Sequence, residues 1–317
     1  MRAVRAVRVR HDGGVTITVL VPDDDGIRAL SEVDGVCPVR YAHDGPLPDA
    51  AAEAEVLIPG ARAAQLAPAL RWMPRLRLIQ LLSAGAEDWA DVLPSGVLLS
   101  TCRGAHGAST AEWVMAAVLS LCRDLGRFDA ARRRGEWSPG TTDTLQGKRV
   151  LVVGAGDVGR QLARRLDPFD TRVRMVGLTA RGDVHGVDEL PALLPDSDVV
   201  VLLVPLTSRT RGMVDETFLA AIPDGGMLVN ASRGAVVDTA ALLRHVTPGR
   251  LRAALDVTDP EPLPPEHPLW TLPNVLVTPH VAGAVHGARR RSYAVAATEI
   301  ARYVQGELPE NLVHGEY

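Results

Sequence analysis

Apolar and polar residues alternate along the chain in a way that predicts strands and helices in turn. A β-branched run at residues 16–21 ends at a proline followed by three aspartates, which is typical of a strand entering a turn. Residues 27–33 predict a short helix. Residues 76–82 are largely apolar and lead into Ser83-Ala84-Gly85, as a buried parallel strand leads into a loop. Further strands are expected at 36–41, 54–58 and 97–100.

A second series of strands and helices follows a long helical segment. Apolar residues recur at helical spacing from about 108 to 125, and charged helix formers continue the segment to 134. The second series runs from 149 to about 280, and residues 287–305 predict a final helix. Strands alternating with helices predict α/β domains with doubly wound parallel sheets. Because no low-complexity linker separates the two series, we expect two domains joined by continuous elements, with a cleft between them.

Composition and charge narrow the class of protein. Hydrophobic residues at 46% and charged residues at 23% are globular values, and no apolar window is long enough to cross a membrane. The net charge of −4 gives no electrostatic reason to expect nucleic acid or an anionic membrane as partner. Cys37, Cys102 and Cys122 are too widely spaced for a disulfide framework or a zinc site, so we expect a reducing, cytoplasmic compartment and no metal. Residues 1–14 lack the apolar core of a secretory signal and predict a frayed or strand-forming leader.

The most specific local motif is a glycine-rich turn between a strand and a helix. An apolar strand at 149–153 leads into Gly154-Ala155-Gly156-Asp157-Val158-Gly159, and an amphipathic helix follows at 160–166. In a dinucleotide site the first two glycines allow a tight turn and close approach of the pyrophosphate. The third glycine lets helix and strand pack, and the helix N-terminus supplies N–H groups and partial positive charge. An unrelated α/β turn is the alternative, but this context favours dinucleotide binding by residues 154–159.

The end of the next strand indicates which dinucleotide is bound. Sites for NAD usually carry an acidic residue there, which binds the ribose 2′-hydroxyl. Here the strand at 173–176 is followed by Gly177, and the first acid afterwards is Asp183. With no carboxylate to repel it, a 2′-phosphate could bind to Thr179 and Arg181, which favours NADP over NAD. The alternative is that Arg181 is one more surface arginine.

Three later segments each place an ionisable residue just after a predicted strand. Open α/β sheets bind ligands at the carboxyl ends of their strands. An arginine, a carboxylate and a histidine at that edge could anchor a substrate carboxylate, tune a base and move a proton during hydride transfer. The three segments are Asn230-Ala231-Ser232-Arg233-Gly234, Asp256 to Leu263, and Thr278-Pro279-His280 with Gly283.

These motifs, in this order, resemble the D-isomer-specific 2-hydroxyacid dehydrogenase family over nearly the whole chain, in particular its glyoxylate and hydroxypyruvate reductases. The resemblance implies a Rossmann coenzyme domain at residues 102–283, inserted into a flavodoxin-like substrate domain at 1–101 and 284–317. It also implies a homodimer formed through the long helix and the arm that ends near Trp137. Besides the glycine motif, the matching segments are 81–85 with Asp88, 204–207, 230–234, 256–263, 267–270, 278–280, and 306 with 311–313.

The resemblance implies roles for the matched residues. His280 would be the general acid–base that protonates the carbonyl oxygen of a 2-keto acid as hydride arrives, a task that suits histidine. Glu261 would orient the imidazole and stabilise the imidazolium, and Arg233 would bind the substrate carboxylate. Backbone N–H groups of Ser83, Ala84 and Gly85 would bind its other oxygen. Further coenzyme contacts are implied for Val204, Pro205, Ala231, Ser232, Arg233, Asp256, His280 and Gly283.

Several alternatives stay open at this point. Asp259 is a rival of Glu261, and His267 and His286 are rivals of His280, although neither of them follows a strand end.

The expected reaction is the NADPH-preferring reduction of a small 2-keto acid, such as glyoxylate, hydroxypyruvate or pyruvate, to the D-2-hydroxy acid, and its reverse. Siblings that oxidise formate, phosphite or 3-phosphoglycerate are the runner-up, although the loop at Ser83 lacks the positive charge that a phosphorylated substrate would need. A dinucleotide-sensing corepressor without turnover is a non-enzymatic alternative. Trp270 would either narrow the pocket or cover the domain surface.

Overall fold

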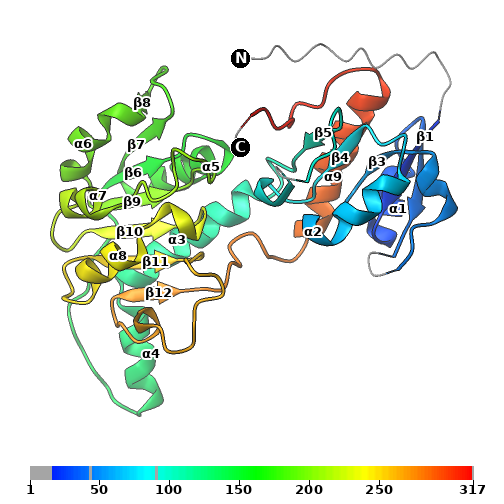
Figure 1. Cartoon of the computed structure of the whole chain (residues 1–317). Coiled ribbons are helices and arrows are strands. Elements are labelled where there is room, and N and C mark those ends of the chain that lie inside the picture. Colours follow the sequence, from blue (N-terminus) through cyan, green and yellow to red (C-terminus); the bar gives the residue numbers. More distant parts are fainter. Residues whose placement is uncertain (1–15, 43–44, 90–91, 316–317) are drawn as a thin grey trace. The chain divides into compact units, whose positions relative to one another are not determined.

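The computed structural model describes residues 16–42, 45–89 and 92–315 and divides into two compact units (Figure 1). Unit 1 comprises residues 1–106 and 286–317, and unit 2 comprises residues 107–285. Each unit has its own parallel sheet with helices on both faces, so the expected α/β fold class is confirmed. The expected leader at residues 1–14 lies outside the described residues.

Unit 1 contains a five-stranded parallel sheet in the order β2-β1-β3-β4-β5. Alternate residues of each strand face opposite layers. Val19 packs towards the final helix with Tyr293 and Tyr303, whereas Leu20 packs on the other face with Leu66. The strands are β1 (Ile17–Val21), β2 (Val36–Arg40), β3 (Ala54–Leu57), β4 (Leu78–Gln80) and β5 (Leu98–Ser100). The helices are α1 (Asp24–Leu30), α2 (Ala63–Leu66), α9 (Ala288–Val304) and the 3₁₀ turns η1 (Asp49–Ala52), η2 (Ala67–Trp72) and η3 (Glu87–Trp89).

Two elements of unit 1 differ from the sequence prediction. The helix expected at 27–33 begins three residues earlier, because the side chain of Asp23 accepts a hydrogen bond from Gly26 N and caps the helix there. The strand expected at 76–82 forms only over Leu78–Gln80, because its neighbours β3 and β5 pair with it over two and three residues.

Unit 2 contains a seven-stranded parallel sheet in the order β12-β11-β10-β9-β6-β7-β8. Val200 of the central strand β9 packs with Leu219 and Leu242 on one face, and Val201 packs with Leu162 on the other. The strands are β6 (Arg149–Val153), β7 (Arg172–Gly177), β8 (Val184–Gly186), β9 (Val199–Leu202), β10 (Met227–Asn230), β11 (Arg252–Leu255) and β12 (Val275–Val277). The helices are α3 (Gly107–Cys122), α4 (Leu125–Arg133), α5 (Asp157–Leu166), α6 (Leu190–Leu193), α7 (Glu216–Ala221) and α8 (Thr239–Val246), with 3₁₀ turns η4 (Asp167–Phe169), η5 (Val187–Glu189), η6 (Leu194–Asp196), η7 (Gly234–Val236) and η8 (Pro268–Trp270).

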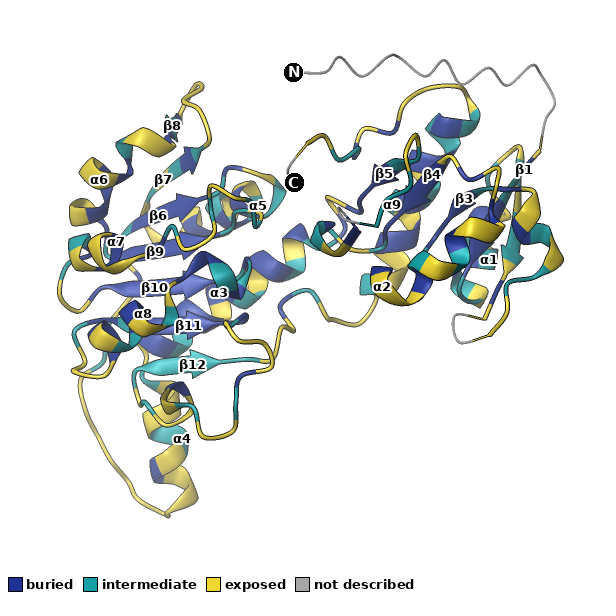
Figure 2. Cartoon of the chain, in the orientation of Figure 1, coloured by how far each residue is buried: buried dark blue, intermediate teal, exposed yellow. Residues whose placement is uncertain are grey.

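The long helix expected from 108 to 134 is interrupted. Asp124 adopts a left-handed conformation with φ of 49°, so α3 ends at Cys122 and α4 starts in a new direction at Leu125. Figure 2 shows that α4 and the segment after it are largely exposed. We call residues 125–142 the arm.

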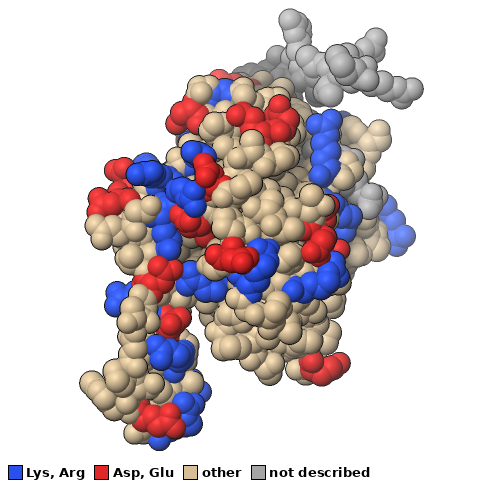
Figure 3. All heavy atoms as spheres, turned by 90° about the vertical axis from the view of Figure 1, so that its left-hand side faces the viewer, with Lys and Arg blue, Asp and Glu red and all other residues tan. Residues whose placement is uncertain are grey.

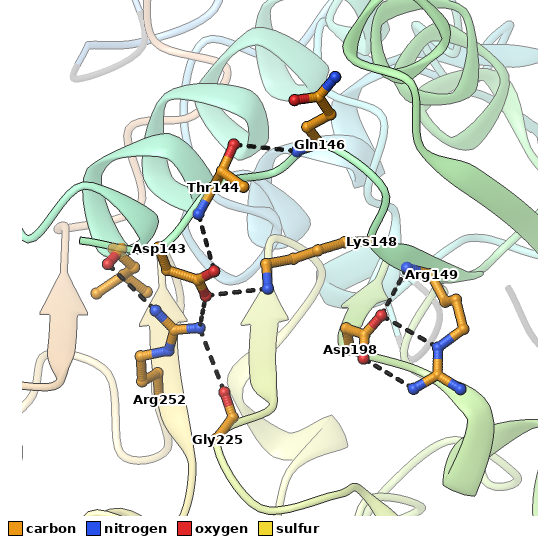
Figure 4. A network of polar contacts seen from close by, with 9 residues as sticks. Asp143, Thr144, Gln146, Lys148, Arg149, Asp198, Gly225 and Arg252 are labelled. Atoms are coloured by element: carbon orange, nitrogen blue, oxygen red, sulfur yellow. Dashed lines mark hydrogen bonds and ion pairs between the residues drawn. The ribbon is translucent and has the colours of Figure 1, made fainter. Parts of the chain in front are cut away.

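A network of ion pairs and hydrogen bonds links Asp143, just after the arm, to residues at the amino-terminal ends of the strands of unit 2 (Figure 4). The Asp143 carboxylate lies 3.0 Å from Lys148 Nζ and 2.9 Å from Arg252 Nη2. Arg252 also donates to the carbonyl oxygens of Leu121 and Gly225. This edge of the sheet is opposite the one at which ligands bind, so the network is structural.

The surface of unit 2 carries both signs of charge. Basic and acidic side chains are interspersed on the face shown in Figure 3, including the arm, where Asp129 pairs with Arg132 and Arg133. Of the helices that the structure describes, none combines the length and the apolar character needed to span a membrane.

Candidate active site

The predicted coenzyme and catalytic residues of unit 2 gather at one edge of its sheet. All seven strands are parallel, so residues that follow them share the carboxyl-terminal edge. The glycine motif follows β6, Gly177 ends β7, and Val204 and Pro205 follow β9. Ala231, Ser232 and Arg233 follow β10, Asp256 and Glu261 follow β11, and Thr278, His280 and Gly283 follow β12.

Each glycine of the dinucleotide motif has its own reason to be glycine. Gly154 has φ of 122°, and a Cβ there would overlap with the carbonyl oxygen of Leu203. A Cβ at Gly159 would overlap with the carbonyl oxygen of Gly154, at the point where α5 meets β6. Gly156, by contrast, is exposed, has no atom within 4 Å of a Cβ position, and caps the N-terminus of α5. The open space over Gly156, beside a helix N-terminus, fits the pyrophosphate of a dinucleotide.

The other two residues of the motif complete the turn. Asp157 is the first residue of α5, and its carboxylate lies against Gly107 at the start of α3, where a Cβ would overlap with it. Val158 is partly buried and packs on the core layer that contains Leu162. The side chains of Asp157 and Val158 therefore pack against α3 and the core, and the backbone of the turn is left to face a ligand.

A guanidinium lies where an NAD site would carry a carboxylate. A Cβ built on Gly177 lies 3.5 Å from Arg181 Nη1 and 3.1 Å from Val184 Cγ1. The backbones of Arg181 and Val184 exchange two hydrogen bonds of 2.9 Å, which close a tight turn through Gly182, with φ of 54°. This turn brings the exposed Arg181 back to the carboxyl end of β7, and Thr179 is also exposed there.

The loop that carries Arg233 is shaped by a buried asparagine. Asn230 Oδ1 accepts hydrogen bonds from Ser232 N (3.1 Å) and Ser232 Oγ (2.7 Å), and Asn230 Nδ2 donates to Arg233 O (3.0 Å). Gly234 allows the next loop to pack here, because a Cβ would overlap with the carbonyl oxygen of Thr258. The sequence motif contains Asn230, but only the contacts assign it this positioning role.

Glu261 and His280 meet at this edge. His280 Nδ1 lies 2.8 Å from Glu261 Oε1, and both side chains are about half exposed. His280 has φ of 55°, and its backbone N–H donates to the carbonyl oxygen of Asp256 (2.7 Å). The peptide bonds before Pro260 and Pro262, on either side of Glu261, are both cis.

The rival residues have other places in the structure. His267 Nδ1 accepts a hydrogen bond from Leu269 N and caps η8. The carbonyl oxygen of Asp259 accepts from Thr239 Oγ1 (2.8 Å), and His286 belongs to unit 1. Trp270 is 46% exposed, and its indole N–H donates to Pro264 O (2.8 Å).

Asp256 holds the loop of His280 in shape. Its carboxylate is buried and accepts hydrogen bonds from Thr278 Oγ1 (2.6 Å), Val281 N (2.8 Å) and Ala282 N (2.9 Å). These hydrogen bonds orient the backbone around His280, and the coenzyme contact expected of Asp256 stays a prediction.

The loop predicted to bind substrate follows β4 in unit 1. Ser83 Oγ donates to Gly85 O (2.7 Å), and Ser83 O accepts from Cys102 N (2.8 Å). Ser83 is exposed, and Ala84 and Gly85 are partly exposed. Among the described residues, no group of three or more histidine, cysteine, aspartate or glutamate side chains could hold a metal ion.

A parallel sheet with a glycine-rich strand–turn–helix at its carboxyl-terminal edge is the class of fold that binds dinucleotides. Comparisons with known proteins identify the family. A model described as "D-isomer specific 2-hydroxyacid dehydrogenase, NAD binding domain" matches residues 115–282. A glyoxylate reductase of Thermofilum pendens is 34% identical over 77% of this chain and 76% of its own length. A D-3-phosphoglycerate dehydrogenase of Methanocaldococcus jannaschii is 28% identical over 94% of this chain and 59% of its own length.

A solved structure gives the same result. The D-isomer specific 2-hydroxyacid dehydrogenase of Xanthobacter autotrophicus, in complex with NADPH and MES, is 31% identical, with a TM-score of 0.82 over 95% of this chain and 98% of that one. The chain therefore belongs to the D-isomer specific 2-hydroxyacid dehydrogenase family, as its motifs predicted. It is an NAD(P)-dependent oxidoreductase of the 2-keto acid and 2-hydroxy acid class.

Proposed function

We propose that this protein uses NADPH to reduce a small 2-keto acid to the D-2-hydroxy acid, and catalyses the reverse oxidation. The observation that carries the proposal is the 2.8 Å contact between His280 and Glu261 at the carboxyl end of β11 and β12. Arg233 follows the neighbouring strand β10, so an acid–base pair and a carboxylate-binding cation share one edge of the sheet. Unit 2 then serves as the coenzyme domain, and unit 1 as the substrate domain.

In this mechanism the bound coenzyme supplies hydride to the carbonyl carbon of the substrate. His280 protonates the carbonyl oxygen through Nε2, because its Nδ1 is held by Glu261. The Glu261 carboxylate orients the ring and stabilises the imidazolium before transfer. Arg233 binds the substrate carboxylate, and backbone N–H groups of residues 83–85 bind its second oxygen. One hydride and one proton convert the keto acid to the hydroxy acid, and the reverse reaction returns the proton to His280.

The names of several relatives favour a small substrate. Relatives named glyoxylate reductase are 31–34% identical to this chain. Glu87 and Asp88 follow the loop at Ser83, and residues 81–90 of the sequence contain no lysine or arginine. This charge disfavours a phosphorylated substrate, although one relative is named D-3-phosphoglycerate dehydrogenase. Glyoxylate, hydroxypyruvate and pyruvate are therefore the substrates to test first.

NADPH is the proposed coenzyme because of the surroundings of Gly177. No carboxylate stands at the end of β7, and Arg181 Nη1 lies 3.5 Å from the Cβ position of Gly177. A guanidinium matches the oxygens of a phosphate, so Arg181 and Thr179 can bind the 2′-phosphate. The similar protein from Xanthobacter autotrophicus was solved in complex with NADPH.

The arm supports a homodimer. Trp137 is 95% exposed, and it lines a groove of about 600 Å³ with Phe128, Ala131 and Pro139 between α4 and the segment after it. A large exposed aromatic beside an apolar groove is typical of a surface that a second chain covers. Sedimentation should give twice the mass of the 33.8 kDa chain, and the mass of a monomer would overturn the dimer.

The experiment that tests the function is an assay at the absorbance band of reduced nicotinamide. NADPH and NADH are supplied separately with glyoxylate, hydroxypyruvate, pyruvate and phenylpyruvate. Rapid oxidation of NADPH by one small acid supports the proposal. A flat trace despite measurable coenzyme binding contradicts it and favours a sibling activity or a dinucleotide sensor. Formate and phosphite with the oxidised coenzymes then separate those two.

A further inference from the structure

The chain leaves unit 1 at His106, just after a segment that is tied to the substrate loop. Residues 101–106 connect β5 to this exit. Cys102 N donates to Ser83 O (2.8 Å), so the connecting segment and the loop after β4 lie side by side. Gln80 Nε2 reinforces this pairing by donating to the carbonyl oxygen of Thr101 (3.1 Å).

The same segment is also tied to the start of α9, where the chain has just returned to unit 1. Arg291 Nε donates to Ala105 O (3.3 Å), and Cys102 Sγ donates to Ser292 O (3.0 Å). Ser292 is buried and stands in the first two turns of α9. The segment by which the chain leaves unit 1 and the helix by which it returns are therefore hydrogen-bonded to each other within unit 1.

One side chain joins all three elements. His106 Nε2 lies 3.1 Å from Leu82 O and 3.2 Å from Ser292 Oγ. A carbonyl oxygen can only accept, so Nε2 carries a hydrogen that it directs to Leu82, with the Ser292 hydroxyl as a second neighbour. Leu82 is the residue immediately before the loop of residues 83–85. The imidazole of His106 thus links Leu82, at the start of that loop, to residues 101–106 and to α9.

We propose that His106 is a positioning residue for substrate binding, which sets the direction of the backbone N–H groups of residues 83–85. This inference rests on the proposed role of that loop in binding the substrate carboxylate. Hydrogen bonds to a carboxylate depend on donor direction, so a loop released at Leu82 binds the carboxylate less well. The residues proposed to bind the coenzyme all lie in unit 2.

The test compares two substitutions of His106 in the full-length chain. His106→Phe keeps a ring but removes the donor, and we expect the KM for the 2-keto acid to rise about tenfold, roughly the effect of one hydrogen bond. Both kcat and the Kd for NADPH should stay within about threefold of wild type, since only substrate binding is weakened. His106→Gln places an amide N–H near the position of Nε2, so its KM should stay close to that of wild type.

Two further variants keep the test decisive. The His106→Asn side chain is polar but too short to reach Leu82 O, so this variant should raise the KM to the same extent as His106→Phe. It provides the test if His106→Phe does not fold. His314→Gln changes an exposed histidine of the same unit and should leave KM unchanged. An active wild type whose KM is unchanged by both His106→Phe and His106→Asn overturns this inference alone. A wild type without turnover on any 2-keto acid overturns the proposed function and this inference with it.

Discussion

Replacing Gly177 with aspartate should change the coenzyme preference from NADPH to NADH. The new Cβ would lie 3.5 Å from Arg181 Nη1 and 3.1 Å from Val184 Cγ1, so the side chain fits after a shift of a few tenths of an ångström by Val184. The carboxylate would pair with the Arg181 guanidinium and take it from the 2′-phosphate. It would also offer the ribose hydroxyls of NADH an acceptor.

The size of the change follows from two losses. A hydrogen bond to a charged group contributes about 1.5–3 kcal/mol, and the exposure of Arg181 places its bond to phosphate at the low end. Repulsion between the carboxylate and the phosphate costs about 1 kcal/mol per unit charge at about 5 Å in a largely solvated site. A phosphate of charge about −1.5 to −2 makes the sum about 3–3.5 kcal/mol, which corresponds to a rise of about 150- to 400-fold in the KM for NADPH.

The assay measures kcat/KM for both coenzymes in the wild type, Gly177→Asp and Arg181→Ala. Arg174→Ala is the matched control, because Arg174 is an exposed arginine of the same strand β7 that lies 3.8 Å from Asp196. Its coenzyme preference should stay that of the wild type. Equal turnover of NADH and NADPH by the wild type, unchanged in Arg181→Ala, would refute the reasoning.

Three further substitutions test the site and the fold. Glu261→Gln should lower kcat about 10- to 100-fold, because it removes the charge that stabilises the imidazolium, while NADPH binding stays unchanged. Steady-state kinetics measure the loss of kcat. Gly234→Ala should lower the Tm by several degrees in a thermal melt, because its Cβ overlaps with a backbone carbonyl. Burial alone would raise the pKa of Asp143, but hydrogen bonds from Lys148 and Arg252 outweigh it and lower the pKa. The Tm of Asp143→Asn should therefore fall below that of wild type at pH 6. The two Tm values should converge as the pH falls from about 5 through the lowered pKa of the folded carboxyl, where the wild-type carboxylate becomes protonated.

Each of these substitutions has a control in the same chain. Glu266→Gln changes an exposed carboxylate of the same loop and should keep full activity. Gly126→Ala meets no atom within 4 Å in α4 and should not lower the Tm. Asp224→Asn removes a carboxylate that is 86% exposed, so the Tm of this variant should equal that of wild type at pH 6 and at lower pH. Each idea fails where a variant and its control behave alike.

The sequence alone determined the features that depend on neighbours along the chain. The strand–turn–helix pattern around the glycine motif identified the dinucleotide turn, because the strand, the glycines and the helix follow one another directly in the chain. The positions of Arg233, Glu261 and His280 after strands followed from hydrophobic runs that end in polar loops. The break at Asp124 escaped the pattern, because helical periodicity continues on both sides of it and a single left-handed residue leaves no periodic signal.

Tertiary structure decided which side chains meet. Strand order is set by long-range pairing, and the adjacency of β11 and β12 brings Glu261 to His280 over a separation of 19 residues. The same pairing places the buried Asp256 under the loop of His280. The link from His106 to Leu82 and Ser292 joins positions up to 186 residues apart. Hydrophobic periodicity specifies the face on which a residue lies, but only the packed sheets and helices bring distant side chains within hydrogen-bonding distance.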